Sequence, residues 1–249
     1  MITRLAALSL ILVIPVSVAT GFPDIAPLAG KYCGYTSLFG FTTISMSLDF
    51  DPAAFRANFL MVIDAVPHAF NSGVAYTLND ESRLTLETDN DSFNEFLAKF
   101  SIGLTPRSFD TTYVRSEDRL DSYILLPFAP RFKVVSDKAM CKQTDESGTY
   151  SATSGEVLLA IDAIAKTISV NKEGEKAPGL TPDGLLSYAL KDDGSFGMTQ
   201  EENEVRSYTL QQIPGVKQLL LQYSVSDGAQ VSLVLVNREK YFGDEMVLL

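Results

Sequence analysis

One histidine and a small set of carboxylates are the side chains in this sequence that could support acid–base chemistry. His68, in Val-Pro-His-Ala-Phe, would have to serve any Ser-His-Asp or Cys-His catalyst, and no Gly-x-Ser-x-Gly elbow accompanies it. Zinc is held by sets of His and Cys, but the chain has no second His and no two Cys close together. Because Pro67 precedes His68, we expect this residue in a turn or at a strand edge.

The carboxylates with the most suggestive spacing are Asp49 and Asp51 in Leu-Asp-Phe-Asp-Pro, with Asp64 in the neighbouring strand. Asp49 and Asp51 are two residues apart and so lie on one face of a strand end, and paired carboxylates can hydrolyse glycosides. This pattern supports an alternative function, a secreted carboxylate-dependent hydrolase acting on glycans. An Asp before Pro is more often a turn former, so the sequence assigns no catalytic residue and on balance disfavours an enzyme.

The segment Asp89-Asn90-Asp91-Ser92 has the acidic density of a calcium loop without its central Gly and bidentate Glu. We interpret it as the start of a helix and expect no metal site. No Gly-rich turn leads from a strand into a helix, so no nucleotide cofactor is expected either. The same segment contains the single Asn-x-Ser/Thr acceptor of the chain, which makes Asn90 the candidate glycosylation site of a secreted eukaryotic protein.

The two cysteines, Cys33 and Cys141, are predicted to form a disulfide, because an even number of cysteines in an oxidising compartment usually pairs. Closing a loop of ~100 residues would stabilise the fold by about 4–5 kcal/mol in the chain-entropy model. The alternative, two separate buried thiols, would suit a cytosolic protein better.

The first residues read as a secretory signal. Arg4 is followed by an apolar run over 5–18, and Ser17 and Ala19 are small residues at the −3 and −1 positions of a cut after Ala19. The run is short for a membrane span of about 20 residues, although an uncleaved anchor is the alternative. We therefore predict a signal peptide over 1–19, a short lead over 20–29 and a secreted, extracellular protein with no membrane span after cleavage.

The formal net charge of −11 argues against nucleic acid as a partner, since an acidic surface repels phosphates. The hydrophobic content of 46% is that of a globular protein and exceeds that of disordered chains.

The segments 76–86 and 188–198 are two versions of one pattern, in which apolar residues alternate on each side of a polar, turn-forming centre. This alternation predicts a β-hairpin in each half of the chain. The flanking matches run in the same order and pair Leu120 with Leu220, Tyr123 with Tyr223, Val134 with Val234 and Val135 with Leu235. We therefore predict a duplication, with a first β repeat over 30–141 and a second over 148–249.

About eight strands per half in meander order favour antiparallel barrels or β-sandwiches, so the predicted fold is mainly β with two tandem repeats. Gly30-Lys31-Tyr32 and Gly148-Thr149-Tyr150 resemble the Gly-x-Trp that opens lipocalin-like barrels, with Tyr where that family has Trp. The resemblance covers three residues per half, implies a lipocalin-like barrel and assigns the chain to no family. The apolar run 59–65 is expected to be covered on both faces.

One stretch departs from the strand pattern. Phe93, Phe96, Leu97 and Phe100 follow helical spacing, and Ser92 followed by Glu95 fits a capping box, so we predict a short amphipathic helix inserted in the first repeat.

These features favour a secreted, non-enzymatic binding or interaction protein. A small apolar ligand in a barrel, a protein or a glycan are the expected partners. A surface component with a purely structural role is the remaining alternative.

Overall fold

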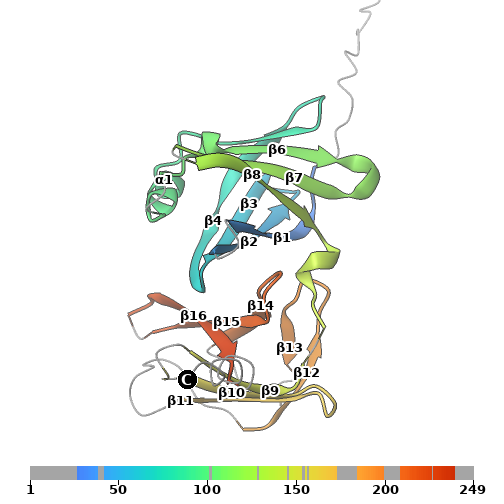
Figure 1. Ribbon diagram of the computed structural model, residues 1–249, viewed down its shortest axis with the longest axis vertical. Coiled ribbons are helices and arrows are strands. Elements are labelled where there is room, and N and C mark those ends of the chain that lie inside the picture. Colours follow the sequence, from blue (N-terminus) through green and yellow to red (C-terminus); the bar gives the residue numbers. More distant parts are fainter. Residues whose placement is uncertain are drawn as a thin grey trace, which may run out of the picture.

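The computed structural model describes residues 27–38, 42–100, 103–127, 129–144, 146–152, 155, 157–172, 184–198, 208–225 and 227–238. The predicted signal peptide, most of the lead and the end of the second repeat lie outside these residues. The described part is mainly β and forms two eight-stranded antiparallel sheets in tandem, as the sequence predicts (Figure 1).

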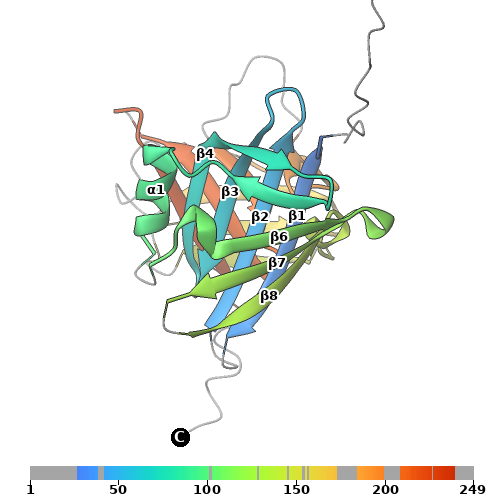
Figure 2. The ribbon, with the colours of Figure 1, turned by 90° about the horizontal axis from the view of Figure 1, so that it is seen from above.

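The first eight strands close into a barrel, here called the first barrel. They are β1 (Gly30–Leu38), β2 (Thr42–Asp51), β3 (Arg56–Ile63), β4 (Val66–Leu78), β5 (Arg83–Leu86), β6 (Phe109–Val114), β7 (Arg119–Leu126) and β8 (Ala129–Asp137). Each strand pairs with the next, and β1 closes on β8 through Cys33 opposite Asp137 and Gly34 opposite Ser136. In Figure 2, β6–β8 cross in front of β1–β4, as expected of a tilted, closed sheet.

The second eight strands curl in the same way and are here called the second barrel. They are β9 (Gly148–Ala152), β10 (Val157–Asp162), β11 (Thr167–Lys172), β12 (Leu186–Leu190), β13 (Phe196–Met198), β14 (Tyr208–Gln212), β15 (Gln218–Ser224) and β16 (Gln230–Asn237). β9 pairs with β16 as β1 pairs with β8, and within the described residues the two edge strands meet near the bridge between Ser195 and Gln211. The first repeat is thus a closed barrel and the second a barrel-like sheet, which favours the barrel alternative over the sandwich.

The hairpins of the two repeats have the same register, as the predicted duplication requires. Tyr76 lies opposite Leu86 and Leu78 opposite Leu84, while Tyr188 lies opposite Met198 and Leu190 opposite Phe196. Strand pairing therefore relates every strand of the first barrel to one of the second.

The predicted matches near the end of each repeat are wrong by one residue. Leu120 lies opposite Ser136 and Leu219 opposite Leu235, and the matched Gly34 and Ala152 lie opposite Ser136 and Leu235, so Leu120 corresponds to Leu219 and not to Leu220. A slip of one residue exchanges the two faces of a strand. Consistent with this, Leu120 and Val134 point into the first barrel, whereas Leu220 and Val234 lie on the outside of the second.

The two interiors differ in polarity. Thr111, Ser122 and Ser136 are buried inside the first barrel, where the matched residues of the second are Leu210, Leu221 and Leu235. The Thr111 hydroxyl donates a hydrogen bond to the Ser122 hydroxyl, and Ser136 Oγ has no partner among the described residues.

The predicted amphipathic helix is present as α1 (Asp91–Ala98), which lies beside β4 in both views (Figures 1 and 2). Phe93, Phe96 and Leu97 add its apolar face to the core of the first barrel. The predicted capping box is wrong, because Asn90 is the N-cap and its side chain accepts a hydrogen bond from the Phe93 amide. The matching connection in the second repeat lies outside the described residues.

The two barrels pack against each other through a small apolar contact. Leu60 and Val62 on the outside of β3 meet Ile213, Leu220 and Val234 of the second barrel. The prediction that segment 59–65 is covered on both faces is confirmed for 59–62, since Phe59 and Met61 point inward, whereas Asp64 beyond the end of β3 is exposed. Three hydrogen bonds support the contact: Ser45 Oγ donates to the Pro214 carbonyl at 2.6 Å, and Lys31 Nζ donates to Gln211 Oε1 at 2.9 Å and to the Asp193 carbonyl at 3.1 Å.

Gly34 lets β1 approach β8 closely, and its replacement by Ala is expected to destabilise the protein by about 1–3 kcal/mol. A Cβ at this position would overlap the Val135 carbonyl oxygen and Ser136 Oγ. The second barrel has Ala152 at the same position, so Ala152→Gly is the matched control and should cost about 1 kcal/mol or less. Chemical unfolding of both variants checks this, and equal effects would show that strand approach does not limit Gly34.

Candidate functional site

A cavity of about 310 Å³ opens at the end of the first barrel where β1 begins. Its lining residues are Pro27, Leu28, Ala29, Tyr32, Tyr113, Arg115, Asp118 and Lys138. Leu28 is buried over the barrel core, and its carbonyl accepts a hydrogen bond from the Tyr76 hydroxyl. One wall of the cavity is therefore apolar, and the other carries charged and phenolic groups.

Asp118 is the centre of the polar wall. Its Oδ1 accepts hydrogen bonds from the Tyr32 hydroxyl at 2.5 Å and the Tyr113 hydroxyl at 2.9 Å. Its Oδ2 accepts one from Lys138 Nζ at 2.9 Å, and this ammonium lies 4.9 Å from the centre of the Tyr32 ring. Groups from β1, β6 and the segment after β8 thus converge on one carboxylate.

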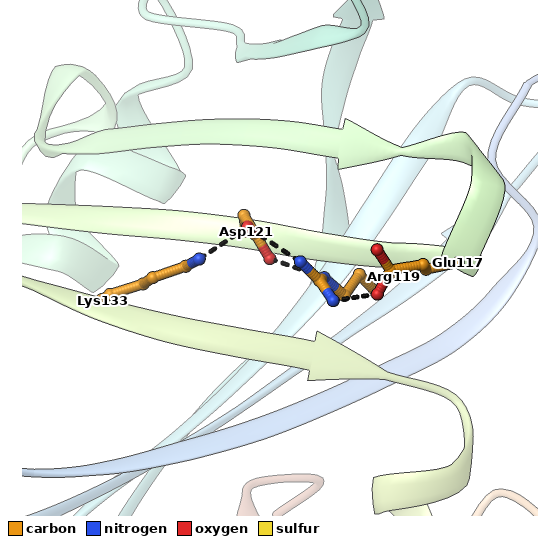
Figure 3. Close-up of polar contacts among 4 residues, drawn as sticks. All are labelled: Glu117, Arg119, Asp121 and Lys133. Carbon is orange, nitrogen blue, oxygen red and sulfur yellow. Dashed lines mark hydrogen bonds and ion pairs between the residues drawn. The ribbon is translucent and has the colours of Figure 1, made fainter.

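The turn that carries Asp118 is held from outside the barrel. The 3₁₀ turn Arg115–Glu117 ends at Asp118, which has a left-handed backbone with φ of 46°. Figure 3 shows a chain of ion pairs beside it: Glu117 pairs with Arg119, and Asp121 joins Arg119 at 3.0 Å and Lys133 at 2.6 Å. This chain ties the turn to β7 and β8, so the position of Asp118 does not depend on its own contacts alone.

The environment fixes the protonation states of the polar wall. The hydrogen bond from Tyr32 lowers the pKa of Asp118 below its usual value, against a smaller opposing effect of burial, and Lys138 lowers it further. Burial raises the pKa of both Tyr32 and Tyr113, and the hydrogen bonds to Asp118 add to that. These groups keep the same charge across neutral pH.

Asp118→Asn is expected to remove an acid-dependent part of the stability. A carboxylate with a lowered folded-state pKa stabilises fully above its unfolded pKa of about 3.9, and the effect is lost as pH falls through the folded pKa. The stability difference between wild type and variant should therefore shrink between about pH 5 and about pH 2. Urea unfolding at several pH values measures it, with exposed Asp80→Asn as control; a difference that is constant with pH would contradict the assignment.

The candidate carboxylates predicted from the sequence lie outside the cavity around Asp118. Asp51 caps a turn by accepting hydrogen bonds from the Ala53 and Ala54 amides, and Asp64 accepts one from the Thr43 amide at the other end of the β2–β3 hairpin. Asp49 is exposed on the outside of β2, opposite Asn58. Asp51 and Asp64 are thus separated by the length of β3 and form no carboxylate pair.

His68 is the third residue of β4 and pairs with Met61 of β3, so it lies close to the β3–β4 turn but within the strand, and its ring centre is 4.5 Å from that of Phe100. Burial lowers its pKa. Asn90 uses its side-chain oxygen to cap α1. Its candidate role as a glycan acceptor stays a prediction.

The predicted disulfide between Cys33 and Cys141 is present. Cys33 lies in β1 beside the seam with β8, and Cys141 ends the 3₁₀ turn Ala139–Cys141 that follows β8. The bond therefore fastens the exit of the first barrel to its entry, close to Lys138.

No local pattern in the sequence marks Asp118, Arg115 or Lys138, because the turn that carries Arg115 and Asp118 meets Lys138 and Tyr32 only in the closed barrel. Tyr32 alone belonged to a noted motif, the Gly-x-Tyr that opens each repeat.

Compared with known families and curated proteins, the chain matches no family model and no curated sequence. No helix among the described residues is long and apolar enough to cross a bilayer. Within the same residues, no group of three or more His, Cys, Asp or Glu is arranged to hold a metal ion.

Proposed function

We propose that this is a secreted, non-enzymatic binding protein, and that the cavity at the mouth of the first barrel takes a small apolar molecule carrying an acidic group. The observation that supports it is the composition of the cavity: one carboxylate, Asp118, faces two cations, Arg115 and Lys138, beside an apolar wall. In this proposal the mature chain begins after Ala19, and the two repeats are its two domains.

The charges of the lining favour an anion. Lys138 already pairs with Asp118 at 2.9 Å, while Arg115 makes one side-chain hydrogen bond within the described part of the chain, from its Nε to Ser82 Oγ at 3.0 Å. The remaining guanidinium donors of Arg115 suit a planar carboxylate, which arginine binds in a fork geometry.

The protonation states support binding over acid–base catalysis. A general acid or base works best with a pKa near the operating pH. Here the pKa of Asp118 is lowered while those of Tyr32 and Tyr113 are raised, so both move away from neutrality.

The volume of the cavity limits the size of the ligand. A volume of about 310 Å³ is at the lower end of ligand sites, which suits a molecule of roughly a dozen non-hydrogen atoms. We therefore choose 4-phenylbutyrate as the probe and its uncharged amide, 4-phenylbutanamide, as the isosteric control.

The test is an NMR titration of the full mature protein, together with native mass spectrometry of freshly secreted material. The carboxylate is expected to shift the backbone signals of Tyr32, Tyr113 and Arg115 in a saturable way, and the amide to bind at least about 10-fold more weakly. Arg115→Gln should weaken the carboxylate by about 10-fold, whereas Arg107→Gln, on an exposed arginine, should not. Equal binding of both probes, or no saturable shift at this mouth, would reject the proposal.

A further inference from the structure

The mouth of the second barrel is the duplicate of the site around Asp118, and strand pairing shows which residues correspond. Tyr113 lies opposite Leu120, and Gln212 lies opposite Leu219 in the same register. Tyr32 has its counterpart in Tyr150, two residues after the first glycine of each repeat. The connections before β7 (115–118) and before β15 (213–217) end in Asp118 and Lys217 respectively. A second cavity, of about 260 Å³, opens at this place.

The second barrel has a charged residue at the position where Leu28 covers the core of the first barrel. Leu28, two residues before Gly30, is buried over the core, whereas Glu146, two residues before Gly148, points to the rim and pairs with Lys217 at 2.7 Å. Ile161, Phe196 and Leu219 of the buried core line the second cavity. The floor of the second cavity is therefore apolar.

The polar lining of this cavity is dominated by amides and a hydroxyl, from Gln143, Thr144, Gln212 and Gln218. The backbone N–H of Gln143 donates a hydrogen bond to Gln212 Oε1 at 2.7 Å. This bond fixes the Gln212 side chain in the wall of the cavity, where the residue is 6% exposed. Neither Thr144 nor Gln218 makes a side-chain hydrogen bond to another residue that the structure describes. Hydrogen-bonding groups are thus available beside the apolar floor.

The charges at this rim are already matched. Lys217 and Glu146 form a largely solvent-screened ion pair, so neither charge is left unmatched for a charged ligand. For an uncharged ligand, the amide and hydroxyl side chains supply both donors and acceptors.

From these observations we infer that the second barrel holds an independent binding site for a small uncharged molecule with an apolar face and an amide or hydroxyl group. A volume of about 260 Å³ corresponds to roughly nine water molecules at ~30 Å³ each, which limits the ligand to about the size of a single substituted ring. The duplication has therefore produced two mouths of different selectivity, since Lys217 replaces Asp118, Gln212 replaces Tyr113 and Glu146 replaces Leu28.

The experiment is an NMR titration of the full mature protein with benzamide, benzoate and benzylammonium, which share one ring and differ in charge. Benzamide is expected to shift the signals of Tyr150, Lys217 and Leu219 saturably, and both charged probes to bind there at least about 5-fold more weakly. Gln218→Ala should weaken benzamide binding by roughly 3- to 10-fold, whereas Gln230→Ala, at the exposed start of β16, should leave the binding unchanged. A thermal melt of each variant verifies that it is folded.

Three outcomes would overturn the inference: no saturable shift with benzamide, equal binding of a charged probe at this mouth, or equal loss in the two glutamine variants. Because the probes and residues differ from those of the first mouth, failure here is distinguishable from failure of the proposed function.

Discussion

Replacement of both Cys33 and Cys141 by Ser is expected to lower the free energy of unfolding by about 4–5 kcal/mol. The bond joins residues separated by 108 positions, and in the chain-entropy model a loop of this length restricts the unfolded chain strongly. Both cysteines are buried, so the serine hydroxyls would add a cost of their own. Urea unfolding with oxidised wild type as reference measures the change, and native-state hydrogen exchange locates it.

Hydrogen exchange should show the loss chiefly in β1 and β8, whose seam lies beside the bond. The second barrel provides the matched control, because Ser151 takes the place of Cys33 there. Ser151→Ala removes only the hydrogen bond from Arg238 Nε and should cost about 1 kcal/mol. An unchanged urea midpoint in the double-serine variant would mean that the bond adds nothing to a seam already held by strand pairing.

Phe93→Ala is expected to destabilise the first barrel by about 3–5 kcal/mol, the usual cost of emptying a buried aromatic site. Phe93 is 0% exposed, and its ring centre lies 5.1 Å from those of both Phe59 and Phe70. The variant would leave a cavity between α1 and the strands. Thermal unfolding followed by circular dichroism provides the measurement.

Glu95→Ala on the exposed face of the same helix is the control and should change stability by no more than about 0.5 kcal/mol. If the two substitutions in α1 have similar effects, the helix lies on the barrel surface without contributing to the core, and the assignment of Phe93 to the core is wrong.

Much of the fold was predictable because the first barrel follows simple alternation. In β2, Ile44, Met46, Leu48 and Phe50 point inward, and the hairpin pattern of 76–86 recurs at 188–198 with identical pairing. The alternation has a direct physical cause, since the inward face of these strands lies on the core while their outward face is polar.

The one-residue error in matching β15 and β16 also has a physical cause. Leu219 and Leu221 point into the second barrel, while Leu220 between them is buried against β3 of the first. A strand covered on both faces loses its alternation, so matching apolar residues cannot tell one register from the next. Only the pairing of β9 with β16 resolves it.

The candidate site was not predictable for a different reason. Tyr32, Tyr113, Asp118 and Lys138 are spread over more than one hundred residues and meet only because the barrel closes. The carboxylates that did stand out, Asp51 and Asp64, serve turns. Short-range spacing detects turn chemistry well and convergence of distant strands poorly.

The position of the disulfide has a consequence for biosynthesis. Both of its cysteines precede the second barrel, so all strands of the first barrel and both cysteines leave the ribosome before β9 does. At ~5–20 residues per second, the remaining hundred or so residues take roughly 5–20 s to appear. The first barrel can fold and form its disulfide within this interval. Its outer surface at Leu60 and Val62 is then in place before the second barrel packs against it.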